Sequence, residues 1–479
     1  MTIDHFSSAG EMLAALRARE ISSVELTDMH IERIEARDGP INAIPVRTFE
    51  RARDSAAAAD ARIAAGESAP LLGLPVTLKE STQVAGLPQS AGMNEFKDYR
   101  PATDCKLATS IFGAGTNLLG KTNIPVALGD WQADSPVYGR THNPWDLTRT
   151  PGGSTGGGSA ALAAGFTPLE QGSDIGGSIR VPAAYCGLYG HRPSETAIPG
   201  SGAFPMADLP NNVFYMGVQG PLARTATDME LFFDVMAGPD VFADVGWKLD
   251  LPPARHTSLA DFRVAVMAPI PGVRASSAVL GRQEELIALL RDAGATVETA
   301  MPPFDVEDYF DDYMRALQVM TTQGMPAELR AQATAGYRAM GTRLGEAMAE
   351  GLNLSAIDYL SLGNRRQAYA LQWQHFFRDF DVLIGPITLD VAFPHKEGNF
   401  TERTLLIDNE EVGYYNNIVY PMLPIFCGLP ATAFPAGRDA QGLPIGLQAV
   451  GAHLEDRTTM AFARLLEERW HRFEAPPGY

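Results

Sequence analysis

Residues 150–182 read TPGGSTGGGSAALAAGFTPLEQGSDIGGSIRVP, and the interpretation of the whole chain depends on this stretch. It contains two serines flanked by glycines, Ser154 and Ser178, separated by an Ala-rich segment over 159–165 with the composition of a buried helix. Glycine is favoured where backbone must approach a ligand closely or adopt a positive φ. The stretch therefore predicts a site built from two glycine loops joined by a short helix.

The segments around this stretch alternate between strand-like and helix-like patterns. Short apolar strands are predicted over 72–80, 117–121 and 168–171, with helices over 104–113 and 159–165 between them. Strands that alternate with helices indicate an α/β sheet covered by helices on both faces.

The two regions outside this α/β pattern are predicted to be helical. Residues 1–70 contain two S-x-x-E capping boxes, at Ser8 and Ser22, each before an apolar period of three to four. Residues from about 300 to 380 read as a helical insertion, whereas turns dominate from 188 to 220. Because no repeat or long polar linker divides the chain, residues 1–479 are predicted to form one domain.

The composition indicates which partners the protein does not bind and in which compartment it works. A formal net charge of −19 argues against nucleic acid and anionic membranes as partners, because both attract basic surfaces. Three widely spaced cysteines without a CxxC motif fit a reducing compartment. The N-terminus lacks the features of a signal peptide, and no apolar run reaches the roughly 20 residues of a membrane span. We therefore expect a cytoplasmic protein with no membrane association.

Ser154 invites two familiar interpretations that its surroundings do not support. Gly152-Gly153-Ser154-Thr155-Gly156 matches the G-x-S-x-G nucleophile elbow, but residues 143–151 do not form the strand that this elbow requires. A phosphate-binding loop is weaker still, because Gly158 occupies the position of its lysine.

The histidines show no metal-binding pattern, and only two of them lie close enough to the serine loops in sequence to be considered as bases. The nine histidines contain no H-x-x-x-H pair, so no metal or other cofactor is expected. His142 and His191 lie nearest the serine loops in sequence and stay open as bases.

Lys79 can supply the base instead. It ends a predicted buried strand, where loss of hydration disfavours the ammonium and lowers its pKa toward neutrality. A neutral lysine can activate a serine. The alternative is an ordinary surface lysine that follows a strand.

These residues closely resemble the amidase signature hydrolases, which use a Ser–cis-Ser–Lys triad. The matching motifs are GLPVTLKE at 73–80, RTPGGS at 149–154, GSDIGGSIR at 172–180 and GLPIGLQ at 442–448. The resemblance spans nearly the whole chain and implies the fold of that family, with a large mixed, mostly parallel central sheet.

The resemblance also implies roles for individual residues. Ser178 is expected to be the nucleophile, Ser154 the bridging serine after a cis Gly153–Ser154 peptide, and Lys79 the base. The backbone amides expected to form an oxyanion hole are those of Ile175, Gly176, Gly177 and Ser178. The supporting residues are Gly153, Thr155, Ser173, Asp174 and Arg180. Departures from the family pattern, Thr155 and Ser173, keep a hydroxyl group and so should keep the proton relay.

The substrate is predicted from the expected pocket walls, which are mostly apolar or aromatic: Met93, Trp131, Val181, Tyr414 and Phe426. They favour a neutral hydrophobic or aryl amide, cleaved through an acyl-enzyme, with an ester or urethane as a side substrate. Alternatives are a glutamine-dependent amidotransferase component that works in transfer RNA amidation, a nylon-oligomer or carbamate hydrolase, and a binding protein without activity. The resemblance also suggests that this protein forms a homodimer, as is common in the family.

Overall fold

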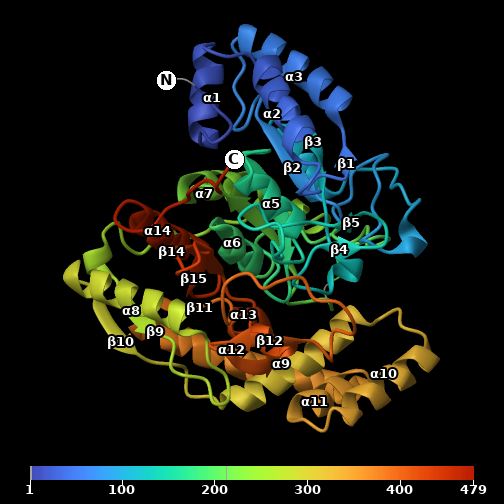
Figure 1. Cartoon of the computed structure of the whole chain (residues 1–479), viewed down its shortest axis with the longest axis vertical. Coiled ribbons are helices and arrows are strands. Elements are labelled where there is room, and N and C mark those ends of the chain that lie inside the picture. The colour runs from blue at the N-terminus through green and yellow to red at the C-terminus, as the bar shows by residue number, and fades with distance from the viewer. Residues whose placement is uncertain (1–2, 212) are drawn as a thin grey trace.

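One sheet runs through most of the molecule in the computed structural model, which describes residues 3–211 and 213–479 (Figure 1). Within these residues it has eleven strands in the order β1-β3-β2-β6-β8-β7-β14-β15-β11-β9-β10. Their bounds are β1 Val46–Arg47, β2 Pro75–Lys79, β3 Asn117–Thr122, β6 Leu169–Asp174, β7 Tyr189–Arg192, β8 Val218–Ala223, β9 Arg263–Val266, β10 Thr296–Thr299, β11 Val382–Pro386, β14 Ala431–Arg438 and β15 Pro444–Val450. The predicted α/β fold with a large mixed sheet is confirmed.

The prediction that most strands are parallel is wrong. Parallel pairs join β3, β2 and β6 near one edge of the sheet, and β11, β9 and β10 at the other. The four strands between these groups, β8, β7, β14 and β15, pair antiparallel with one another and with their outer neighbours. The difference arises because β7 and the first half of β8 lie in the segment, 188–220, that the sequence pattern assigns to turns.

Helices cover both faces of the sheet, as β7 shows. Gly190 faces α6 (Arg180–Cys186), where the Ala183 side chain would lie 3.1 Å from a Cβ at that glycine. The next residue, His191, stacks edge-to-face on Phe233 of α7 (Ala226–Met236) and contacts Asp456 of α14 (Asp456–Glu467). Successive side chains of a strand point to opposite faces, so α6 covers one face and α7 and α14 cover the other. The helices that accompany the sheet are α4 Lys106–Gly113, α5 Gly156–Ala163, α6 Arg180–Cys186, α7 Ala226–Met236, α8 Ser277–Asp292, α13 Val419–Phe426 and α14 Asp456–Glu467.

The predicted helical regions lie at opposite ends of the molecule (Figure 1). The N-terminal group is α1 Ala9–Ala18, α2 Ser23–Arg37 and α3 Phe49–Ala64, and both predicted capping boxes are formed. The second group is α9 Val306–Thr321, α10 Ala327–Ala339, α11 Arg343–Gly351 and α12 Ala356–Asp379. None of the helices in the described residues combines the length and apolar character of a membrane span.

Contacts distant in sequence join these parts. A continuous cluster of buried apolar residues extends from Ala9 in α1 to Leu466 in α14. The C-terminal tail returns to the N-terminal helices, where Phe473 packs against Phe6 and Arg37 donates to the Gly478 carbonyl. These contacts support our proposal that the chain folds as one domain.

Candidate active site

Three hydroxyl groups surround the amine of Lys79. This residue ends β2 and is completely buried. Its Nζ lies 2.7 Å from Ser154 Oγ, 3.0 Å from Thr155 Oγ1 and 2.9 Å from Ser173 Oγ. An ammonium can donate hydrogen bonds to all three oxygens, whereas a neutral amine can donate to two of them and accept a hydrogen bond from the third hydroxyl group. The arrangement therefore suits both protonation states of the lysine.

The sheet and α5 bring these hydroxyl groups together. Strands β2 and β6 are parallel, so Lys79 and Ser173 lie toward the same edge of the sheet. Ser154 and Thr155 precede α5, and the peptide between Gly153 and Ser154 is cis. A Cβ at Gly153 would lie only 2.3 Å from the Asp130 carbonyl oxygen, so this position requires glycine.

Burial weakens the proton affinity of Lys79. Loss of hydration lowers its pKa from the ordinary 10.5 to about 7, against the opposing charges of Asp174 and Glu170. A substantial fraction of the amine is thus neutral near pH 7. The lowered pKa agrees with the expectation for Lys79, and its role as the base stays a prediction.

Ser178 lies beside this group, in the loop between β6 and α6. Its carbonyl oxygen accepts a hydrogen bond from the Thr155 N–H at 3.2 Å, which ties the two serine loops together. Its side chain is nearly buried, at 6% exposure. In the described part of the chain no hydrogen bond joins its Oγ to that of Ser154.

The amides expected to form an oxyanion hole do not all point the same way. The Gly177 N–H donates to Asp174 Oδ1 at 2.9 Å, so this amide is occupied, contrary to the prediction. Among the described residues, no hydrogen-bond acceptor is found for the N–H groups of Ile175, Gly176 and Ser178. These three remain as candidate donors.

Asp174 and Arg180 form a buried ion pair that shapes this loop. Arg180 contacts both carboxylate oxygens, with Nε 3.0 Å from Oδ2 and Nη2 3.1 Å from Oδ1. Burial alone would raise the pKa of Asp174, but the charge and hydrogen bonds of Arg180 outweigh it and lower the pKa. The carboxylate is therefore ionised and anchors the backbone at Gly177 and Ile179.

Two aromatic side chains donate hydrogen bonds to carbonyl groups of the same loop. Trp131 Nε1 donates to the Gly176 carbonyl at 2.9 Å, and the Tyr313 hydroxyl donates to the Ile175 carbonyl at 2.9 Å. The sequence placed Trp131 in a pocket wall but missed Tyr313, which comes from α9. The carbonyl and the N–H of one peptide group point in opposite directions. The two bonds therefore also fix the directions of the Gly177 and Gly176 N–H groups.

Replacing Trp131 by phenylalanine should lower kcat of the expected amidase reaction by about three- to tenfold, because one neutral hydrogen bond to the loop is lost. Trp145→Phe is a matched control: Trp145 Nε1 donates at 3.2 Å to the Cys186 carbonyl, which lies at the end of α6. Steady-state kinetics of the two variants would test this role, and equal losses of kcat would contradict it.

The remaining predicted pocket residues differ in position. Tyr414 packs on Trp131 with ring centroids 5.3 Å apart, and Val181 lies against the glycine loop, where its Cγ2 would be 2.9 Å from a Cβ at Gly177. Phe426 is fully buried, and its ring is T-shaped to that of Tyr313, with centroids 6.5 Å apart. Met93 precedes a short 3-10 helix, Asn94–Phe96, and its N–H donates to the Ser90 carbonyl; no described contact joins it to the serines.

Neither histidine serves as a base for the serines in this structure. His191 lies in the core, with Nδ1 2.9 Å from Thr432 Oγ1 and Nε2 3.0 Å from Asp456 Oδ1. His142 Nδ1 lies 2.6 Å from the Leu147 carbonyl oxygen. The partners of both rings lie outside the Lys79 cluster, which consists of Lys79, Ser154, Thr155 and Ser173.

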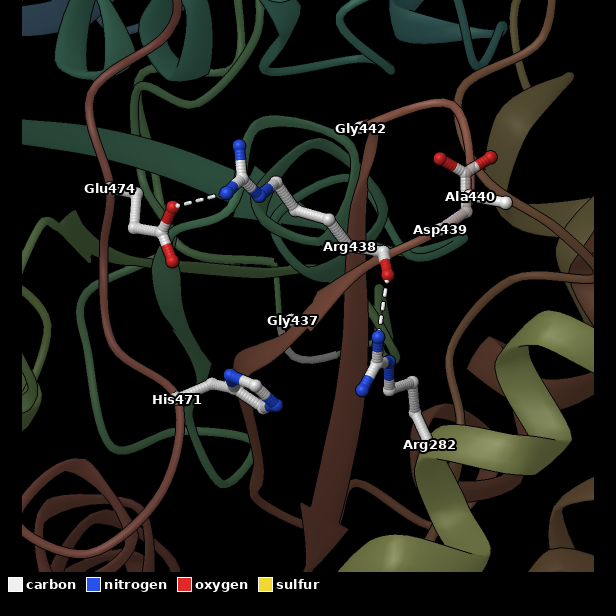
Figure 2. A pocket seen from close by; sticks show the side chains of 8 residues that line it. All are labelled: Arg282, Gly437, Arg438, Asp439, Ala440, Gly442, His471 and Glu474. Carbon is white, nitrogen blue, oxygen red and sulfur yellow. Dashed lines mark hydrogen bonds and ion pairs between the residues drawn. The ribbon is translucent and has the colours of Figure 1, made fainter.

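A surface pocket of about 480 Å³ lies apart from these residues, at the β14–β15 hairpin (Figure 2). Its two guanidinium groups are already engaged: Arg438 pairs with Glu474, and Arg282 with Glu285 and the Arg438 carbonyl. None of its lining residues belongs to the Lys79 cluster.

Known proteins match the chain along its length. The model of the family described as Amidase matches residues 25–460.

The chain belongs to the amidase family.

The amidase family is a family of hydrolases that act on amide C–N bonds, and the relatives agree with this assignment. The chain is 30% identical to a glutamyl-tRNA(Gln) amidotransferase subunit of Roseiflexus sp. (strain RS-1), over 98% of each chain. A bacterial aryl acylamidase of the amidase signature family has a similar structure, with a TM-score of 0.80, 26% identity and coverage of 97% of this chain and 96% of that one. A chain of an inhibitor-bound vestigial protein complex, described as revealing the evolutionary origins of an s-triazine catabolic enzyme, gives a TM-score of 0.83 at 27% identity, with coverage of 98% of this chain and 100% of that one.

Proposed function

We propose that this amidase cleaves neutral hydrophobic or aryl amides through an acyl-enzyme on Ser178. The observation that carries the proposal is the completely buried Lys79, 2.7 Å from Ser154 at the cis peptide. A lysine that is neutral near pH 7 and bonded to a serine is a suitable start for a proton relay.

The proposed mechanism moves one proton along this relay. Neutral Lys79 takes a proton from Ser154 as Ser154 takes one from Ser178, and the Ser178 oxygen attacks the amide carbonyl. The amides of Ile175, Gly176 and Ser178 hold the developing oxyanion; one such donor contributes about 3 kcal/mol in a transition state. The proton returns through Ser154 to the leaving nitrogen, the C–N bond breaks, and water then hydrolyses the ester.

Apolar side chains lie beside the loop that contains Gly176 and Gly177, which supports a substrate with a neutral acyl group. Ile418 and Pro421 lie against the loop, within 3.3 Å and 2.9 Å of Cβ positions at Gly176 and Gly177. The Arg403 guanidinium lies 5.5 Å from the ring centroid of Tyr414, but it is paired with Asp130, so it does not offer a free cation to a carboxylate.

Hydrolysis rates for a panel of amides would test the substrate class. We expect kcat/KM for an anilide of a hydrophobic acid to exceed that for the amide of a dicarboxylic acid by about tenfold or more, because the apolar surroundings penalise a buried charge. A panel in which only the acidic amides react would contradict this substrate class.

The pH dependence of kcat/KM should follow the protonation of Lys79. Its pKa of about 7 lies below the ordinary value, so the amine is neutral above this pH and charged below it. We expect kcat/KM to fall about tenfold for each pH unit below about 7 and to be level just above it. Profiles measured from about pH 5 to 9 would check this, and constant kcat/KM across pH 7 would contradict it.

The second candidate is a component that supplies ammonia for transfer RNA amidation, favoured by the 30% identity to the Roseiflexus amidotransferase chain over nearly the full length. Such a component needs glutamine and a protein partner. Gel filtration with activity assays separates the candidates: an isolated chain, monomer or homodimer, that hydrolyses aryl amides supports the hydrolase. A chain that is active on glutamine only with partner proteins supports the alternative.

We also propose that the protein works in the cytoplasm, on a small-molecule amide, without a cofactor and without binding nucleic acid. Its three cysteines, Cys105, Cys186 and Cys427, are buried and free, which supports a reducing compartment.

A further inference from the structure

Glu170 is a buried carboxyl group with no part in the mechanism proposed above. It is the second residue of β6 and is fully buried. Its Oε1 accepts a hydrogen bond from the Thr122 hydroxyl at 2.7 Å, and its Oε2 has no partner within the described residues. A buried carboxyl group that lacks its full set of hydrogen bonds is costly to ionise, which calls for a functional explanation.

The strand register places Glu170 on the same face of the sheet as Lys79. Thr77 pairs with Glu170 between β2 and β6, and Lys79 pairs with Thr122 between β2 and β3. Side chains two residues apart on a strand share a face, so Thr77 and Lys79 point to the same side as their partners. Helix α5 covers this face; a Cβ at Gly158 would lie 2.4 Å from Glu170 Oε1. The glycine leaves the space that the carboxyl group occupies.

We propose that Glu170 is a positioning residue that sets the protonation state of Lys79 through its charge. This inference rests on the proposed function, in which Lys79 must be neutral to act as the base. A negative Glu170 stabilises the ammonium, and a neutral Glu170 favours the amine.

The other charged groups near Lys79 are already compensated. Asp174 is the other carboxylate that acts on it, and Arg180 pairs with Asp174 directly while Arg192 lies 4.0 Å from it. Lys121 precedes Thr122 in β3, so it points to the opposite face, where Nζ bonds the Pro88 carbonyl. The packed elements α5 and β8 contain no titratable residue. Glu170 is therefore the group whose charge is free to change.

Both groups change charge in the same pH range. Burial lowers the pKa of Lys79 to about 7, and burial raises the pKa of Glu170 to about 7, against the opposing effects of the Thr122 hydrogen bond and the charge of Lys79. Two interacting groups of this kind titrate as a pair. Removing the charge of Glu170 should therefore lower the pH at which Lys79 loses its proton.

The experiment uses the small number of lysines in this chain. There are six, Lys79, Lys97, Lys106, Lys121, Lys248 and Lys396, so protein labelled with ¹³C at lysine Cε gives a simple NMR spectrum. The Lys79 signal is assigned from the Lys79→Met variant and followed across pH in the full-length protein. In Glu170→Gln, we expect its titration midpoint to fall by about one pH unit. The acidic limb of kcat/KM should move in the same direction.

A second variant and a control keep the test decisive. Thr122→Val removes the hydrogen bond to Glu170, which raises the pKa of that carboxyl group and should also lower the Lys79 midpoint. Glu80→Gln is the matched control: Glu80 follows Lys79, is equally buried, and accepts hydrogen bonds from Ser90, Ala91 and Tyr138. Its charge acts on Lys121, so the Lys121 signal should shift and the Lys79 signal should not.

An unchanged Lys79 midpoint in both Glu170→Gln and Thr122→Val would overturn the proposal. A merely structural role for Glu170 would lower thermal stability without moving the Lys79 midpoint. If no amide is hydrolysed by the wild-type protein, the proposed function fails, but the NMR titration still reports on the Lys79–Glu170 pair.

Discussion

Replacing Lys79 by methionine is expected to lower kcat/KM for amide hydrolysis by about a thousandfold, the usual contribution of a general base. Methionine is similar in length, so the packing around β2 changes little. The hydroxyl groups of Ser154, Thr155 and Ser173 then lose the amine that they surround. Without an acceptor for its proton, Ser178 stays a neutral, weak nucleophile.

Lys121→Met is a control that separates the effect of Lys79→Met on catalysis from any effect on stability. Lys121 is also fully buried, and burial lowers its pKa to about 8, but its Nζ bonds the Pro88 carbonyl. Lys121→Met should change the free energy of unfolding by an amount similar to that in Lys79→Met, with kcat/KM retained within about threefold. Steady-state kinetics and thermal unfolding of both variants would check this. Equal losses of activity would show that Lys79 acts only through packing.

The two serines should differ even more in what their removal does. Ser178→Ala is expected to reduce kcat to the background rate, at least about ten-thousandfold, and to form no acyl-enzyme. Ser154→Ala interrupts the relay but keeps the nucleophile, so it should be slowed about a thousandfold and still form the acyl-enzyme at long times. Rapid-quench kinetics with an activated ester would separate these outcomes. An acyl-enzyme formed by Ser178→Ala but not by Ser154→Ala would reverse the two roles.

Local patterns predicted the elements that carry the site. The Ala-rich segment became α5, the apolar runs before Lys79 and before Ser173 became β2 and β6, and both S-x-x-E boxes cap helices. These elements have short-range signals that do not depend on the rest of the fold. The link between Lys79 and Ser154, 75 residues apart, came from the resemblance to a family and not from spacing.

The centre of the sheet could not be predicted in the same way. Strands β7 and β8 contain Gly, Pro, Gln and His and are buried along their whole length, so they show neither alternation nor a run of apolar residues. Strand β7 and the first half of β8 were assigned to turns, so the antiparallel pairs of β8 with β6, of β7 with β8 and of β14 with β7 were missed. Helix α6 was missed because its seven residues are too few to show a helical period.

Parts of the site depend on contacts that no local pattern reveals. Tyr313 reaches the Ile175 carbonyl from a helix more than a hundred residues away. The Gly177 amide could not be distinguished from its neighbours until Asp174 was seen to accept its hydrogen bond. Nothing in the sequence around Glu170 distinguishes it from other strand residues. Only the strand register shows that it lies on the same face of the sheet as Lys79.

The most direct test of the account is to locate the covalent adduct that the enzyme forms. The protein would be incubated with a fluorophosphonate or an activated amide, digested, and its peptides sequenced by mass spectrometry. The account predicts one adduct, on Ser178, that is absent in Ser178→Ala and slow to form in Lys79→Met. An adduct on Ser154, or full-rate labelling of Ser178 in Lys79→Met, would contradict it.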